Sequence, residues 1–99
     1  AKAFDTFCPF GPVIETELEL DTARVTANLN GRVRQDYSVE DLFYKPEELV
    51  SLISRDMTLE PGDIISCGTG PGALPLKAGV TIEVSVDGIG TLSNRFSDG

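Results

Sequence analysis

One stretch of the chain combines the features of a ligand-binding turn, Gly62–Gly72, which reads GDIISCGTGPG. A short apolar run there ends in three glycines and a proline. Glycine permits positive φ and removes the Cβ that would keep a ligand away from the backbone. Thr69 is the only polar side chain of the turn, and amides with one hydroxyl suit a small anion or a carbonyl group. The same residues also fit a plain β-turn.

The residue types available limit the acid–base chemistry of the chain. Histidine, the commonest general base, does not occur among the 99 residues, so a reaction must use lysine, carboxylates or hydroxyls, or a base from another segment. Three carboxylates, Glu15, Glu17 and Glu19, recur with the period of a strand and would share one face of it. They fit either a site for a hard metal ion or a solvated acidic face, and no second ligand type accompanies them.

Two β-hairpins are predicted to form the framework that positions these residues. Alternating runs at residues 24–29 and 32–37 are joined by Asn30-Gly31, the strongest short-range signal for a type I′ turn. Residues 80–86 alternate between apolar and polar side chains, and Asp87-Gly88 then begins a return strand.

One helix and two shorter strands complete the expected elements. The helix is predicted over residues 45–56, where Pro46 suits the first turn and apolar residues recur at helical spacing. Apolar runs at residues 13–14 and 64–67 predict short strands. The sequence therefore predicts a mainly β fold of about six strands, a sandwich or roll, with one short peripheral helix.

Composition indicates one small soluble domain with a modest core. The formal charge of −8 argues against nucleic acids and anionic membranes as partners, and no apolar run approaches the ~18 residues of a membrane span. Cys8 and Cys67 lie in apolar stretches and are predicted to be buried free thiols, which indicates the cytoplasm. Phe7 and Phe10 predict that the N-terminal loop is packed.

A series of short motifs, taken in order, resembles the fumarylacetoacetate hydrolase family over nearly the whole chain. The motifs are Lys2–Pro12 (KAFDTFCPFGP), Asn30-Gly31 with Gln35-Asp36, Leu59–Ile65 (LEPGDII), Gly68–Gly72 (GTGPG), Leu76–Gly79 (LKAG) and Gly88–Leu92 (GIGTL). The resemblance implies a mixed β-sandwich roll, a cytoplasmic homodimer and a role in aromatic catabolism. It also implies a divalent metal, Mg²⁺ or Mn²⁺, that stabilises an enolate of a 2-oxo acid or acylpyruvate.

The resemblance assigns roles to four residues. Lys2 matches the family's lysine and is expected to be catalytic, as a cation near the metal and the developing oxyanion. Thr69 matches the threonine of the family's Gly-Thr-Pro turn and is expected to bind the substrate carboxylate with the amides around Gly68 and Gly70. This turn reads Gly-Thr-Gly-Pro-Gly, one glycine more than the family pattern.

The resemblance also implies that part of the active site lies outside this chain. The family's metal ligands, a Glu-x-Glu pair and an aspartate, and its histidine–glutamate pair precede the lysine that matches Lys2. No metal ligand is therefore assigned here. Residues 1–99 are expected to be a single β-rich segment, the C-terminal part of a catalytic domain whose upstream part is absent from the chain and is its partner.

Several functions fit this resemblance. The first is hydrolysis of the carbon–carbon bond of a fumarylacetoacetate- or fumarylpyruvate-type substrate. Alternatives within the family are decarboxylation of a 2-oxo acid and isomerisation of a muconate-type acid. An alternative of another class is an inactive β module that uses its exposed sheet edges for assembly.

Overall fold

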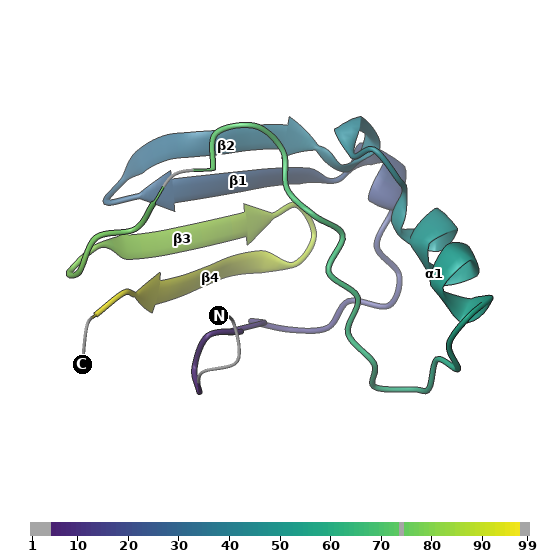
Figure 1. Ribbon diagram of the computed structural model, residues 1–99. Helices are drawn as coiled ribbons and strands as arrows, with labels where there is room; N and C mark the ends of the chain where they lie inside the picture. The colour runs from purple at the N-terminus through teal and green to yellow at the C-terminus, as the bar shows by residue number, and fades with distance from the viewer. Residues whose placement is uncertain (1–4, 74, 98–99) are drawn as a thin grey trace.

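A four-stranded antiparallel sheet with one helix at its end makes up the regular part of the protein (Figure 1). The structure, a computed structural model, describes residues 5–73 and 75–97. The strands lie in the order β2-β1-β3-β4. The elements in chain order are η1 (Leu20–Thr22, 3₁₀), β1 (Arg24–Leu29), β2 (Arg32–Ser38), η2 (Val39–Asp41, 3₁₀), α1 (Pro46–Ser54), β3 (Thr81–Val86) and β4 (Gly90–Arg95). The mainly β class with one short helix is confirmed.

Both predicted hairpins are present. Asn30 and Gly31 join β1 to β2 with φ values of 49° and 82°, the left-handed conformation that a type I′ turn requires. The Asn30 side chain also accepts a hydrogen bond from the amide of Thr81, 2.9 Å away, and the Asn30 amide donates to the Thr81 carbonyl at 2.9 Å. The first turn therefore helps to attach the second hairpin to the first.

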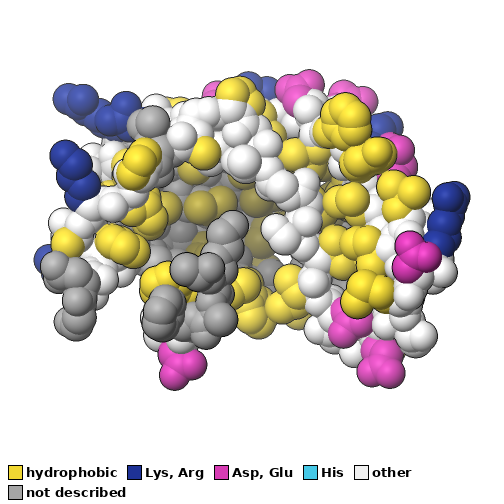
Figure 2. All heavy atoms as spheres, in the orientation of Figure 1, with side chains coloured by type: hydrophobic (Ala, Val, Ile, Leu, Met, Phe, Trp, Pro, Cys, Tyr) yellow, Lys and Arg dark blue, Asp and Glu magenta, His cyan; other side chains and the backbone are white. Residues whose placement is uncertain are grey.

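Pairing between β1 and β3 joins the two hairpins and gathers apolar side chains on one face. Val25 lies opposite Val86, and Ala27 lies opposite Val84. Directly opposed residues of antiparallel strands point to the same side of the sheet, so these four side chains share what we call the inner face. Figure 2 shows hydrophobic side chains at the floor of a hollow on the side of the molecule drawn there.

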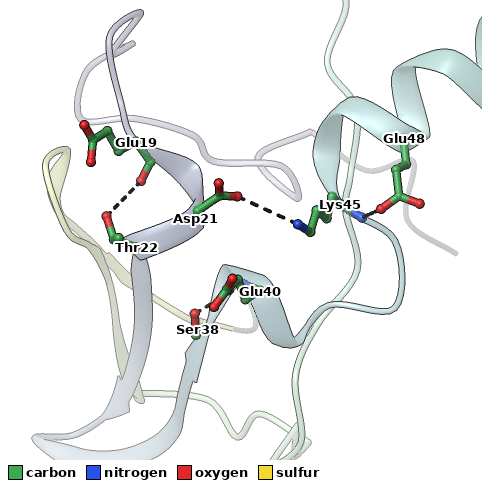
Figure 3. Close-up of polar contacts among 7 residues, drawn as sticks. All are labelled: Glu19, Asp21, Thr22, Ser38, Glu40, Lys45 and Glu48. Atoms are coloured by element: carbon green, nitrogen blue, oxygen red, sulfur yellow. Dashed lines mark hydrogen bonds and ion pairs between the residues drawn. The ribbon is translucent and has the colours of Figure 1, made fainter.

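The predicted helix is confirmed as α1, with the amide of Lys45 donating to Glu48 Oε1 at 3.3 Å before its first turn. Figure 3 shows the polar contacts around η1, η2 and the start of α1. Lys45 Nζ lies 4.0 Å from the Asp21 carboxylate in η1, and the Ser38 hydroxyl accepts from the Glu40 amide at the start of η2. Among the described residues, no helix is long and apolar enough to cross a membrane.

The two shorter strands were predicted wrongly, because residues 13–14 and 64–67 are irregular. Residues 64–67 precede Gly70 and Gly72, which lie against β2, and residues 13–14 follow Gly11, which lies near Leu92 of β4. Neither segment forms a backbone ladder with the sheet. The carboxylates of Glu15, Glu17 and Glu19 do not share a strand face either. Glu15 Oε1 instead accepts a hydrogen bond from the Glu17 amide at 2.9 Å, and the chain then enters η1.

Burial within the described residues is slight. Those that count as buried core are small or medium in size, Ala23, Ala27 and Val39. Cys8 is exposed and Cys67 is half-buried, so the prediction of two buried thiols is wrong for Cys8, although both are free. Phe7 and Phe10 are 53% and 68% exposed, so these two phenylalanines are not buried as predicted. Such side chains need a further surface to cover them.

Candidate functional site

The turn that contains Thr69 is held on β2 by one side-chain amide. Gln35 Nε2 lies 2.6 Å from Thr69 Oγ1, 2.9 Å from the carbonyl oxygen of Gly70 and 3.3 Å from that of Pro71. Three consecutive residues of the turn thus contact a single donor group from the middle of a strand. We call residues 68–72 the Thr69 loop.

Two glycines let the Thr69 loop lie directly on β2. A Cβ at Gly70 would stand 2.5 Å from Cδ1 of the Tyr37 ring. At Gly72, where φ is +99°, a Cβ would overlap the carbonyl oxygen of Arg34. Any larger residue at either position would push the loop off the strand. The glycines here therefore serve close packing as well as the turn.

The Thr69 loop and the N-terminal segment, residues 6–11, lie at opposite edges of the same sheet face. Gln35 lies opposite Ala27, Ala27 lies opposite Val84, and Val84 lies opposite Leu92. The side chains of this row therefore share the inner face. The Thr69 loop contacts this face at β2. At the other end, a Cβ on Gly11 would lie 4.0 Å from Cδ1 of Leu92.

The predicted site residues have different positions in this arrangement. Thr69 is exposed, and its hydroxyl lies 3.1 Å from the Gly70 carbonyl oxygen, to which it can donate. Gly68 is exposed with φ +91°, and Gly70 is half-buried beneath Tyr37. Lys2 lies outside the described residues. Among the described residues that come after it, Gly11 lies near Leu92 of β4, on the face that also carries the Thr69 loop.

Gln35 is a site residue that the sequence analysis did not assign. In the sequence it stands out only as part of the Gln35-Asp36 motif of the family. A signal for it exists in the strand pattern, because Gln35 occupies the same alternate position as Tyr37 on the apolar side of β2. A half-buried amide on an apolar face requires hydrogen-bond partners, and the Thr69 loop provides them.

A separate cavity of about 500 Å³ opens between the N-terminal segment and the ends of β3 and β4. Its lining residues include Phe7, Pro9, Leu76, Ile82 and Phe96, together with the charged Arg95. Thr69 and Gln35 do not line this cavity. The candidate site rests on the hydrogen bonds and close contacts of the Thr69 loop, and the cavity is a second, mostly apolar feature.

The outer face of the sheet carries an ion pair instead. Arg24 Nε donates to Asp36 Oδ1 at 2.5 Å, and both side chains are about half exposed. This hydrogen bond, with the attraction of the Asp36 charge, raises the pKa of the Arg24 guanidinium above its usual value. The group stays charged at every pH at which a protein is assayed, so it takes no part in proton transfer.

The described residues do not form a metal centre. In this part of the chain, no three histidine, cysteine, aspartate or glutamate side chains lie close enough together to hold an ion. The donor set of the Thr69 loop is one hydroxyl and backbone groups, which suits a carboxylate better than a divalent cation.

Comparison with known proteins decides the family. The model of the fumarylacetoacetate (FAA) hydrolase C-terminal region matches residues 1–97. The chain belongs to the fumarylacetoacetate hydrolase family. Among its relatives, an uncharacterized protein of Methanocaldococcus jannaschii is 42% identical over 98 residues, which are 99% of this chain and 41% of the relative. The oxaloacetate tautomerase YisK of Bacillus subtilis is 40% identical over 105 residues, covering 96% of this chain and 35% of the relative.

Solved structures of the family share the fold. A 5-carboxymethyl-2-hydroxymuconate delta-isomerase from Mycobacterium smegmatis superposes with a TM-score of 0.91 at 41% identity, over 95% of this chain and 38% of that one. A maleylpyruvate hydrolase from Sphingobium sp. SYK-6, in complex with manganese(II) and pyruvate, gives a TM-score of 0.89 at 34% identity, over 96% and 37%. The chain spans about two fifths of the length of the first relatives that it matches.

Proposed function

We propose that this chain supplies the carboxylate-binding side of an active site that cleaves the carbon–carbon bond of an acylpyruvate, of the fumarylacetoacetate or fumarylpyruvate type. The observation that carries the proposal is the Thr69 loop, where an exposed hydroxyl stands beside backbone groups and is fixed from below by Gln35. The Thr69 hydroxyl and the amides around Gly68 and Gly70 hold the substrate carboxylate. Lys2 is the cation near the developing oxyanion.

The proposed enzyme requires a divalent metal, Mg²⁺ or Mn²⁺, whose ligands lie outside this chain. A related hydrolase binds manganese(II) together with pyruvate, the smallest 2-oxo acid, which supports both the metal and the substrate class. The metal supplies Lewis-acid stabilisation of an enolate when bound. Residues 1–99 are then one β-rich part of a catalytic domain, and the upstream part and a second subunit are its partners.

A second candidate is isomerisation or tautomerisation of a 2-oxo acid. The identity of 40% to an oxaloacetate tautomerase and of 41% to a muconate-type isomerase favours it. These reactions share with the hydrolysis an enol or enolate beside a carboxylate, so the Thr69 loop would have the same role in each. A decarboxylase is the remaining alternative of this chemistry.

A substrate panel on the intact protein tests the proposal. Fumarylpyruvate, maleylpyruvate, oxaloacetate and a muconate-type acid are each assayed with Mn²⁺ or Mg²⁺. We expect hydrolysis of an acylpyruvate to pyruvate, its loss on chelation of the metal, and its recovery when metal is restored. Turnover of oxaloacetate or the muconate-type acid alone would replace hydrolysis with the second candidate. No turnover of any substrate would favour the inactive assembly module.

A further inference from the structure

We propose that Gln35 is a positioning residue that directs the Thr69 hydroxyl toward the substrate. This inference rests on the proposed function, because it concerns how the Thr69 loop binds a carboxylate. Gln35 itself is half-buried in β2, whereas Thr69 is exposed on the loop above it. The short contact between them, 2.6 Å from Nε2 to Oγ1, links a hydrogen-bonded strand of the sheet to the hydroxyl that meets solvent.

The orientation of the Gln35 amide follows from its partners. The carbonyl oxygens of Gly70 and Pro71 can only accept hydrogen bonds, and they lie 2.9 Å and 3.3 Å from the same atom as Thr69 Oγ1. That atom must therefore be the donor nitrogen and not the amide oxygen. Thr69 Oγ1 accepts from it, so the hydrogen of the hydroxyl must point away from Gln35.

The hydrogen of the Thr69 hydroxyl has one acceptor within the loop, the Gly70 carbonyl oxygen. A ligand can take the place of this acceptor without leaving the carbonyl unpaired. Thr69 Oγ1 lies 3.1 Å from the Gly70 carbonyl oxygen. Gln35 already donates to that same oxygen. When the hydroxyl turns toward a bound carboxylate, the Gly70 carbonyl therefore keeps a partner, and the new bond to a charged acceptor is the stronger one. Gln35 thus makes Thr69 a donor toward the ligand.

The substitution Gln35→Glu reverses this arrangement while keeping the size of the side chain. An ionised carboxylate can only accept, so it draws the Thr69 hydrogen downward and faces the carbonyl oxygens of Gly70 and Pro71 without a donor. Once protonated, the same carboxyl donates one hydrogen bond again. The pH at which the substrate binds well therefore reports whether residue 35 must be a donor.

The test measures KM against pH for the preferred 2-oxo acid, using the intact, metal-loaded protein. At neutral pH we expect Gln35→Glu to raise KM about tenfold or more, and the ratio to wild type to fall as pH is lowered and the carboxyl protonates. Gln35→Met, which has no donor, should raise KM by a factor that does not change with pH. A factor for Gln35→Glu that is equally constant would overturn the inference.

Two controls distinguish a failure of this inference from a failure of the proposed function. Asn30→Asp adds the same charge to the same hairpin but keeps the acceptor used by the Thr81 amide, so its KM should match wild type. In the Thr69→Val background, the part of the effect that acts through the hydroxyl is lost, so Gln35→Glu should raise KM by a smaller factor than it does in the wild-type background. If Thr69→Val itself leaves KM unchanged, the proposed binding role of the loop fails as well. If Thr69→Val raises KM and the Gln35 variants do not, only the inference about Gln35 fails.

Discussion

The threonine hydroxyl groups of the chain differ in whether their hydrogen can be donated to a ligand. Thr22 Oγ1 donates to the Glu19 carbonyl, and Thr91 Oγ1 shares a hydrogen bond with the Ser85 hydroxyl at 2.7 Å on the outer face of the sheet. Thr69 Oγ1 receives a hydrogen bond from Gln35 below and faces solvent above. Of these three threonines, Thr69 is the one whose hydrogen can turn from its carbonyl partner, that of Gly70, to a ligand while Gln35 still donates to that carbonyl.

The substitution Thr69→Val keeps the shape of the side chain and removes this hydroxyl. We expect KM for the substrate to rise about tenfold or more, since a lost hydrogen bond to a charged group is worth about 1.5–3 kcal/mol. Steady-state kinetics on the intact protein measures the change. Thr91→Val is the matched control, because it removes a paired hydroxyl from the outer face and should leave KM unaltered. Equal KM values for all three proteins would remove Thr69 from the site.

At the scale of elements, local signals and distant contacts had different predictive value. The turns at Asn30-Gly31 and Asp87-Gly88 carry their conformation in neighbouring residues, so both hairpins were predictable. Residues 64–67 have a strand-like composition, but the chain after them reaches β2 across its face. One contact that holds it there comes from the side chain of Gln35, which is 34 positions from Thr69 in the sequence. Periodicity alone cannot reveal such a contact.

Two glycines with similar backbone conformations test the close packing of the Thr69 loop. Gly62 and Gly72 have φ values of +95° and +99°, but a Cβ at Gly62 meets no described atom within 4 Å, whereas at Gly72 it overlaps the Arg34 carbonyl. Gly62→Ala should therefore cost only the backbone term, about 1–2 kcal/mol. Gly72→Ala should cost clearly more and also raise KM, because the loop must move. Thermal unfolding and kinetics of both variants give the comparison, and equal losses of stability would contradict the contact.

At the scale of the whole molecule, the described residues form one four-stranded sheet that buries few side chains. Burial is confined to Ala23, Ala27 and Val39 among the described residues, while Phe43 is 90% and Ile14 86% exposed. The sequence indicated a modest core. The extent of this exposure was not predictable from it, because composition does not state which apolar side chains a chain can cover by itself.

The last prediction concerns residues 1–99 in isolation. Because so many large apolar side chains remain exposed, we expect this chain alone to bind anilinonaphthalene sulfonate strongly and to unfold without a sharp heat-absorption peak. The intact protein, measured in parallel by dye fluorescence and calorimetry, should bind little dye and unfold cooperatively. We expect the difference because the proposed function includes an upstream part of the domain, which would cover these exposed side chains. A chain that alone excludes the dye and melts in one cooperative transition would instead be a self-sufficient β module, which would favour the assembly role over the enzymatic one.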